Sequence, residues 1–161
     1  RNTVGSMEFG GVMLNKFLNK GNSRGQKRLT TDVYQIATGI LFQSPLQMFA
    51  LTPNNLVETK DFLIDFMKEI PTSWDETLYI DGYPGRYSVI ARRHDDQWYI
   101  VGVNALDRPV ELKLNLSMVA GKAVSIYSDN SNKEAVFTHS KIGKNGSFTV
   151  IIQPNGGFIV K

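Results

Sequence analysis

Two adjacent carboxylates beside a tryptophan are the first residues whose chemistry could matter. Asp75 and Glu76 directly follow Trp74, and a pair of carboxyl groups can serve general acid and base catalysis. Neighbouring residues of a strand point to opposite faces of a sheet, however, so the two carboxyl groups should not converge on one substrate. We therefore expect a structural role for both side chains at a domain junction.

Metal binding is the second chemistry to consider. The pairs Asp95-Asp96 and Asp129-Asn130 offer oxygen ligands, but both fit ordinary turns and fall short of the roughly six to eight oxygens that calcium takes. The two histidines, His94 and His139, do not stand at a metal-ligand spacing. The chain has no Cys, which excludes thiolate ligands and Cys nucleophiles. We therefore expect no catalytic and no metal site in this chain.

Composition narrows the possible partners. A chain of 161 residues with 42% hydrophobic residues and a net charge of +3 is typical of a globular protein with one core or two small ones. The basic residues are scattered and not interleaved with aromatic residues, so we expect no nucleic-acid partner. Since no run of 18 or more apolar residues occurs, we expect no membrane span.

Helical spacing dominates the first seventy residues after a strand-like opening. Residues 1–9 read as a short extended segment with no second strand pattern after it until residue 76. Thr31-Asp32 predicts the start of a helix that ends near Ser44-Pro45. A short apolar helix is expected over 45–51. A third helix is expected over 55–70, burying Leu56, Phe62, Leu63, Phe66, Met67 and Ile70.

From Thr72 onward the pattern changes to the alternation of strands. A hairpin around His94-Asp95-Asp96-Gln97 forms its centre, and its second strand is nearly all apolar, which predicts a strand covered on both faces. Short strands separated by turn residues indicate an antiparallel, Greek-key-like sandwich. The expected strands are 76–80, 87–93, 98–104, 110–116, 123–127, 134–139, 147–153 and 157–160. We expect one domain over 1–71 and another over 72–161.

An aromatic platform for sugar rings is an alternative use of the sandwich. Aromatic residues are frequent in its first half, but most of them should fill the core, since exposed apolar patches are the exception on a monomer. This reading would make the domain a non-catalytic carbohydrate-binding module. The residues concerned are Trp74, Tyr79, Tyr83, Tyr87, Trp98 and Tyr99.

The order and spacing of several segments resemble the C-terminal part of glycoside hydrolase family 97, the bacterial α-glucosidases and α-galactosidases. The segments are Arg1 to Phe9, Gln43-Ser44-Pro45-Leu46-Gln47-Met48, Ile70 to Thr77, Ile90 to Arg93 with Trp98-Tyr99, and Pro154-Asn155-Gly156-Gly157-Phe158. The resemblance implies a (β/α)₈ catalytic barrel followed by a C-terminal β-sandwich. Residues 1–9 would then be the last barrel strand, and the helices after it would close the outer ring.

The resemblance also implies where the chemistry lies. The parent enzyme would hydrolyse terminal α-glucosides or α-galactosides, by inversion or retention according to the separation of its two carboxyl groups. Its catalytic carboxylates and calcium-binding glutamates would precede Arg1, in an upstream barrel domain, and this fragment would be a structural, inactive piece without bound calcium. The resemblance further implies a periplasmic or secreted bacterial enzyme acting on oligosaccharides. Glu8 is the one candidate for substrate binding, at the rim of the barrel.

Overall fold

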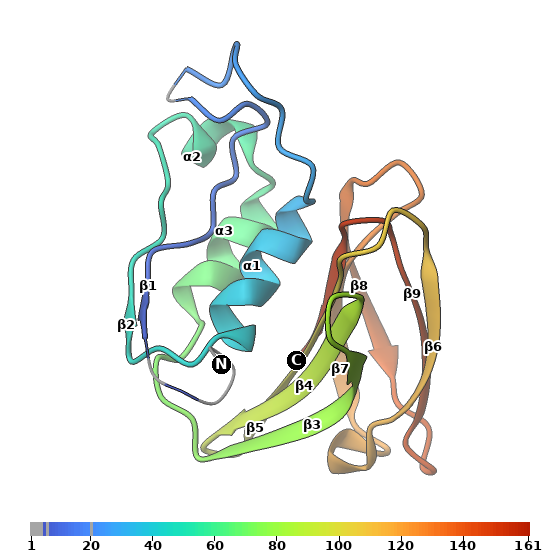
Figure 1. Cartoon of the computed structure of the whole chain (residues 1–161). Coiled ribbons are helices and arrows are strands. Elements are labelled where there is room, and N and C mark those ends of the chain that lie inside the picture. Colours follow the sequence, from blue (N-terminus) through green and yellow to red (C-terminus); the bar gives the residue numbers. More distant parts are fainter. Residues whose placement is uncertain (1–4, 6, 20) are drawn as a thin grey trace.

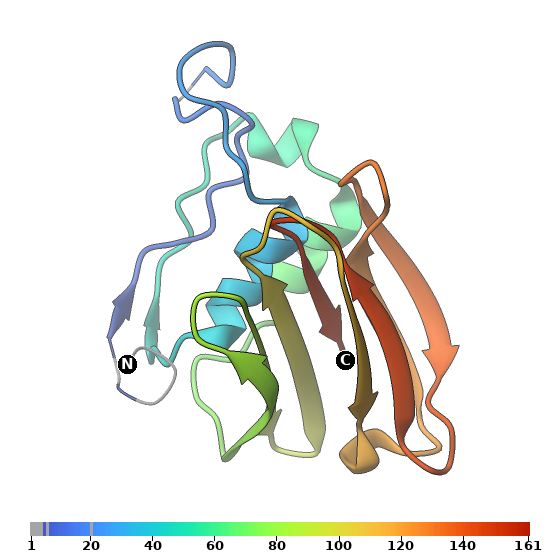
Figure 2. The same ribbon diagram turned by 45° about the vertical axis from the view of Figure 1, so that its right-hand side comes forward.

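The computed structural model describes residues 5, 7–19 and 21–161, and it arranges them in three layers (Figure 1). Helices form the first layer, a six-stranded sheet the second and a two-stranded sheet the third. The helices are α1 (Asp32–Leu41), α2 (Asn55–Glu58) and α3 (Asp61–Lys68), and a 3₁₀ turn spans Ser117–Val119. Figure 2, turned by 45°, shows α1 lying across the face of the six-stranded sheet.

The six-stranded sheet is antiparallel throughout, in the order β3-β4-β5-β10-β7-β8. The predicted antiparallel sandwich is confirmed, and each of the eight expected strands is present with ends shifted by no more than a few residues. Their bounds are β3 (Glu76–Tyr83), β4 (Tyr87–His94), β5 (Gln97–Asn104), β6 (Val110–Asn115), β7 (Ala123–Asp129), β8 (Ala135–Lys141), β9 (Ser147–Ile152) and β10 (Gly157–Val160). Strands β6 and β9 pair with each other and make the third layer.

Alternation along the strands divides the core into two clusters. On one face of the six-stranded sheet, Ile90, Val101 and Ile159 pack against the buried face of α1, which includes Ile36 and Ile40. On the other face, a second cluster includes Ile100 and Phe158 together with Leu112, Leu114, Val150 and Ile152 of β6 and β9. Burying one such side chain contributes about 2 kcal/mol to folding. Strand β5 is therefore covered on both faces, as its apolar sequence predicts.

A short parallel pair near the start of the chain differs from the sequence-based expectation. Strand β1 (Glu8–Phe9) pairs in parallel with β2 (Leu46–Gln47), so a second strand does lie between residues 9 and 76. The helix expected over 45–51 is wrong, because that segment is extended and continues the pairing. Met48 N–H donates to Phe9 O at 2.9 Å, and Ala50 N–H donates to Gly11 O at 3.0 Å. A short apolar run between prolines fits a helix or a strand equally well.

The helix expected over 55–70 is divided in two. Thr59 and Lys60 have extended backbones, with ψ of 144° and 132°, and they separate α2 from α3. The expected burial is correct for Leu63, Phe66 and Met67, but Leu56 on α2 is 64% exposed. Lys60 Nζ donates to Ala135 O at 2.8 Å, which ties the break to the sandwich. The division of the chain at residues 71 and 72 stays a prediction.

Candidate functional site

Glu8 lies on β1 and is exposed. Its backbone stands opposite Leu46 of β2, and α1 connects the two strands. Because the strands are parallel, the loops that follow them leave at the same end, where the active-site loops of a (β/α)₈ barrel gather. Glu8 therefore belongs to a β-α-β unit. Among the described residues, no second carboxyl group is hydrogen-bonded to its side chain.

A network of amides joins the loops that follow β1 and β2. Asn15 is 3% exposed, and its Oδ1 accepts from Asn55 Nδ2 at 2.7 Å and from Asn54 Nδ2 at 2.9 Å. Asn15 Nδ2 donates to Asn19 O at 2.7 Å, which closes the first loop on itself. Hydrogen bonds from Asn22 and Asn54 lower the pKa of the exposed Glu58 carboxyl. This end of the β-α-β unit is thus fixed by side chains and not only by backbone.

A buried carboxyl group joins α1 to the sheet. Asp129 Oδ2 accepts from Thr31 Oγ1 at 2.7 Å and from Gly157 N–H at 2.8 Å, and Thr31 caps α1 by accepting from Tyr34 N–H at 3.0 Å. Burial raises the pKa of Asp129 from 3.8 to about 6, although both hydrogen bonds act in the opposite direction. The turn expected at Asp129-Asn130 is present and begins at Asn130, whose Oδ1 accepts from the N–H groups of Asn132 and Glu134, whereas Asp129 ends β7 and is 5% exposed.

A buried guanidinium makes the second joint between the layers. Arg92 on β4 is 0% exposed, donates to Leu41 O at 3.1 Å and to the side chain of Gln43, and lies 5.7 Å from the centre of the Trp74 ring. Burial lowers the pKa of Arg92 from 12.5 to about 10. The last residues of α1 and the loop after it are therefore held to β4 by one side chain.

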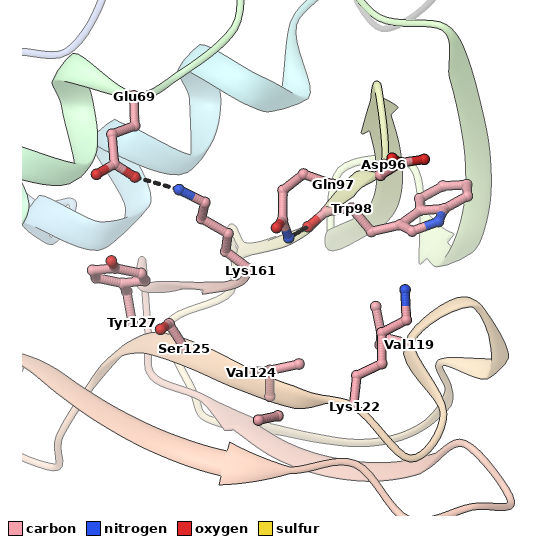
Figure 3. A pocket seen from close by; sticks show the side chains of 11 residues that line it. Glu69, Asp96, Gln97, Trp98, Val119, Lys122, Val124, Ser125, Tyr127 and Lys161 are labelled. Atoms are coloured by element: carbon pink, nitrogen blue, oxygen red, sulfur yellow. Dashed lines mark hydrogen bonds and ion pairs between the residues drawn. The ribbon is translucent and has the colours of Figure 1, made fainter.

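A polar cavity of about 360 Å³ opens between α3 and the sandwich (Figure 3). Lys161 Nζ forms an ion pair with Glu69 on one side of it. Burial would lower the pKa of Lys161, but the bond with Glu69 and the nearby acidic groups outweigh that effect and raise it. Gln97, Trp98, Lys122 and Ser125 are among the other residues of the wall.

The paired carboxylates of the sequence have a structural role, but the geometry differs from expectation. Asp75 precedes β3, so the alternation of side chains along the strand does not apply to it. Both carboxylates therefore reach the guanidinium group of Arg93. Arg93 Nε lies 3.3 Å from Glu76 Oε2, and Arg93 Nη1 lies 3.5 Å from Asp75 Oδ2. Asp75 Oδ2 also accepts from the backbone N–H of Asp95 at 2.7 Å, which fixes the hairpin turn.

The two histidines do not converge. His94 Nδ1 lies 3.0 Å from Ser73 O, and His139 Nδ1 lies 3.3 Å from Ser125 Oγ. Within residues 5, 7–19 and 21–161, no three His, Asp or Glu side chains are grouped so that they could hold a metal ion. No helix in the same part of the chain is long and apolar enough to cross a membrane.

An exposed aromatic groove fits the alternative that the sequence left open, an aromatic platform on the sandwich, at two of its six residues. Tyr79 on β3 is 67% exposed and Tyr83 is 58% exposed, whereas Tyr99 is buried at 4%. The groove has a volume of about 300 Å³ and lies at the end of the β3–β4 hairpin. The expectation that the aromatic residues fill the core therefore holds for Tyr99 and fails for Tyr79 and Tyr83.

Comparison with protein families gives one match over more than half of the chain. A model described as "Glycosyl-hydrolase 97 C-terminal, oligomerisation" matches residues 73–161. Among curated proteins, a retaining alpha-galactosidase of Bacteroides thetaiotaomicron is 32% identical over 134 residues, which are 79% of this chain and 20% of that protein. A probable retaining alpha-galactosidase of Streptomyces bingchenggensis is 27% identical over 105 residues, 65% of this chain and 15% of that protein.

Solved structures give matches over nearly the whole chain. The crystal structure of a beta-arabinopyranosidase is 52% identical with a TM-score of 0.96, covering 100% of this chain and 26% of that one. A family 97 enzyme of Pseudoalteromonas sp. strain K8, solved with panose, has a TM-score of 0.80 at 21% identity, and the match covers 97% of this chain and 26% of that one. At this identity the similarity supports the fold and nothing further. The chain thus spans about a quarter or less of these relatives. The resemblance seen in the sequence is confirmed, and the chain belongs to glycoside hydrolase family 97, with residues 73–161 forming the family's C-terminal domain.

Proposed function

We propose that this chain is the C-terminal part of an exo-acting glycosidase and that it supports the catalytic domain without doing chemistry itself. The observation that carries the proposal is the 52% identity to a beta-arabinopyranosidase along the full chain, with a TM-score of 0.96. The match to the family model adds to it. Glycosidases of this kind need two carboxyl groups on either side of the scissile bond. The described residues offer no such pair, since Asp75 and Glu76 both contact Arg93.

The names of two relatives favour a substrate of the galacto configuration, when the arabinose in the first name is taken as the L sugar. A β-L-arabinopyranoside matches an α-D-galactopyranoside at every shared ring carbon and lacks only the hydroxymethyl group at C5. The names of the relatives at 52% and 32% identity therefore describe one sugar shape, with an axial hydroxyl at C4. We propose that the whole enzyme cleaves terminal pyranosides of this shape in preference to α-glucosides, with retention of configuration.

The first seventy residues fit the end of a (β/α)₈ barrel. The parallel pair β1–β2 with α1 as its connection is the repeating unit of that fold. Several large apolar side chains of this part are exposed, as expected where an upstream barrel would cover them. They are Leu29, Leu46, Met48, Leu56 and Val57. In this arrangement Glu8 lies at the rim of the barrel, as a candidate for substrate binding.

A direct test compares the 161-residue chain with the enzyme that carries the upstream barrel. Nitrophenyl β-L-arabinopyranoside, α-D-galactopyranoside and α-D-glucopyranoside serve as substrates. We expect the longer enzyme to cleave the first two at least about tenfold faster than the third, because one misplaced hydroxyl costs a polar site more than 1 kcal/mol. The chain alone should release no nitrophenol. Turnover by the chain would refute its non-catalytic role, and preference for the glucoside would refute the sugar assignment.

The family resemblance adds two proposals, that the whole enzyme binds calcium and that it is periplasmic or secreted. The described carboxylates do not group into a site for calcium, so the ligands of such an ion would come from upstream glutamates. A chelator should then lower the activity of the longer enzyme and leave the melting temperature of the 161-residue chain unchanged. We further propose a periplasmic or secreted location, which cell fractionation of the source bacterium tests.

The polar cavity beside Lys161 supports a second candidate function, binding of oligosaccharide away from the active site. Its volume of about 360 Å³ suits one or two sugar rings, and its wall carries amide, hydroxyl and charged groups with one tryptophan. Titration of the chain with an α-galacto-oligosaccharide, followed by NMR, should then shift signals of this wall. Gln97→Ala and Lys122→Ala should weaken binding, while Lys113→Ala, an exposed lysine of β6 outside the lining of the cavity, should not.

A further inference from the structure

The β1–β2 pair has one face against α1 and one exposed face. On the first face, Phe9 packs edge-on against Phe42 with the ring centres 5.8 Å apart, and Gln47 Nε2 donates to Gly39 O of α1 at 2.8 Å. A Cβ at Gly39 would lie 3.5 Å from the ring of Phe49. Figures 1 and 2 show the helices between this pair and the six-stranded sheet. Phe9, Gln47 and Phe49 therefore lie on the helix side of the pair.

Glu8, Leu46 and Met48 lie on the opposite face, because successive side chains of a strand alternate. Leu46 is 60% exposed and Met48 is 63% exposed, and Glu8 is exposed as well. In a (β/α)₈ barrel the helices form the outer ring, and the other face of the strands lines the interior. In the barrel proposed above, these side chains therefore point inward.

Met48 lies beyond the last residue of β2, toward the mouth of this barrel. Met48 N–H donates to Phe9 O at 2.9 Å and Ala50 N–H donates to Gly11 O at 3.0 Å, so the parallel pairing continues past both strands. The same register sets Gly10 opposite Met48. Active sites of (β/α)₈ barrels lie at the carboxyl ends of the strands. The inward positions Gly10 and Met48 are therefore at the level where substrate binds.

Gly10 leaves open space beside the side chain of Met48. A Cβ at Gly10 would meet no heavy atom of the described residues within 4 Å, its chain neighbours left aside. Methionine is apolar and adaptable, so its side chain fits irregular apolar surfaces. A pyranose of the galacto configuration has such a surface, because its axial C4 hydroxyl leaves the C–H groups at C3, C4 and C5 together on one face. That face is complementary to a methionine with an empty place next to it.

We propose that Met48 binds substrate in the whole enzyme, by packing against the apolar face of the terminal galacto-configured ring, with Gly10 leaving room for that ring. The proposal rests on the proposed function, both on the barrel and on the sugar. It adds an apolar contact to the polar candidate Glu8, which lies one inward position deeper on the same face. The carboxylate of Glu8 is suited to a sugar hydroxyl, and the thioether of Met48 to the C–H groups.

Kinetics of the enzyme that carries the upstream barrel test the proposal, with nitrophenyl α-D-galactopyranoside as the substrate. Met48→Ala should raise KM about tenfold and change kcat by less than about twofold, because an apolar contact present before and during the reaction acts on binding alone. Met48→Leu keeps an apolar side chain of similar volume and should restore most of the affinity. Gly10→Leu should raise KM by about tenfold or more, because its side chain occupies the place of the ring.

Met118→Ala is the matched control. Met118 lies in the 3₁₀ turn of the sandwich and packs against the second core cluster, so its loss should leave KM unchanged even if the melting temperature falls. Circular dichroism and the melting temperature check that each variant is folded. Competitive inhibition by D-galactose gives the affinity of any variant that turns over too slowly for KM to be measured.

Unchanged KM and inhibition constants in both Met48→Ala and Gly10→Leu overturn the proposal. So does a rise in KM of the same size in Met118→Ala, which would assign the effect to stability. A wild-type preference for the α-glucoside refutes the sugar assignment of the proposed function and is measured without any variant. In that case a higher KM of Met48→Ala for the glucoside would still support the contact of Met48 with substrate.

Discussion

Thr31 Oγ1 donates a hydrogen bond of 2.7 Å to Asp129 Oδ2, across 98 positions of the sequence. Thr31 caps the first helix, and Asp129 ends the seventh strand. The same carboxylate oxygen also accepts from Gly157 N–H of the central strand β10. A single buried acid therefore holds a helix of the first layer and two strands of the second in register.

Replacing this acid should change how stability depends on pH. The pKa of Asp129 in the folded state, about 6, lies above its ordinary value of 3.8, so the folded state binds the proton more tightly than the unfolded state. The stabilisation that comes from this protonation is therefore fully present below about pH 4. It is lost as pH rises through 6, at a cost of about 3 kcal/mol in the free energy of unfolding. Asp129→Asn keeps an acceptor for Thr31 and Gly157 without the charge. We expect the stability of the wild type relative to this variant to fall by about 2 to 3 kcal/mol from pH 4 to pH 7.5.

Urea unfolding of both proteins across that range provides the measurement. Asp107→Asn is the control, because Asp107 is an exposed turn carboxylate and its loss should leave the pH profile of the wild type intact. A constant difference between the wild type and Asp129→Asn across the range would show that the buried acid does not titrate there.

Removing the hydroxyl of Thr31 should destabilise the fold at neutral pH. Thr31→Ala removes the cap of α1, worth about 1 kcal/mol, and also leaves the Asp129 carboxylate with one donor fewer in a buried place. We expect a loss of about 2 to 3 kcal/mol, measured by urea unfolding at pH 7.5. Thr31→Ser keeps the hydroxyl and should lose less than half of that, whereas equal losses would assign the effect to the methyl group.

Gly102 should not tolerate a side chain. A Cβ at this position of β5 would collide with the Phe158 ring on the neighbouring strand, with two of the ring carbons at 2.9 Å. Phe158 is 0% exposed, and because protein interiors are close-packed, moving its ring aside is costly. We expect Gly102→Ala to cost about 2 kcal/mol or more in the free energy of unfolding. Gly10→Ala, where nothing lies within 4 Å of the added carbon, should be close to neutral, and similar melting temperatures for the two variants would contradict the contact.

Arg92 should matter through its contacts and not through its charge alone. Arg92→Ala leaves Leu41 O and the Gln43 side chain without their donor and opens space beneath Trp74. We expect a loss of about 3 kcal/mol, as when a buried charged hydrogen-bonding group is removed. Calorimetric unfolding measures it against Arg108→Ala, an exposed arginine of a turn. A loss below about 1 kcal/mol would show that the contacts of Arg92 do not hold the layers together.

The sandwich could be predicted from the sequence because its information is local. Alternation places Ile100 and Val101 on opposite faces of β5, and the turn residues Asp95 and Asp96 mark where the hairpin reverses. Both the two faces of β5 and the position of the hairpin turn can be inferred from residues that are neighbours in the sequence. The family segments between Ile70 and Thr77 and around Trp98 supplied the rest.

Features that depend on distant partners could not be predicted in the same way. Two residues, Leu46 and Gln47, form β2 only because Glu8 and Phe9 offer an edge to pair with. The burial of Asp129 depends on Thr31, and its one local signal is the alternation that puts it on the same face of β7 as Tyr127. The exposure of Tyr79 follows from the position of β3 at the edge of the sheet, which the order of strands in the sequence does not reveal.

Strand β10 has a consequence for the order of folding. It lies between β5 and β7, which belong to separate local hairpins. Both hairpins can form from nearby residues, but each keeps one unpaired apolar edge until 157–160 arrive between them. Long-range pairing of this kind is slow, and it leaves intermediates with unpaired apolar edges, which are prone to aggregate during synthesis. The six-stranded sheet can therefore close only after residues 157–160 have been synthesised.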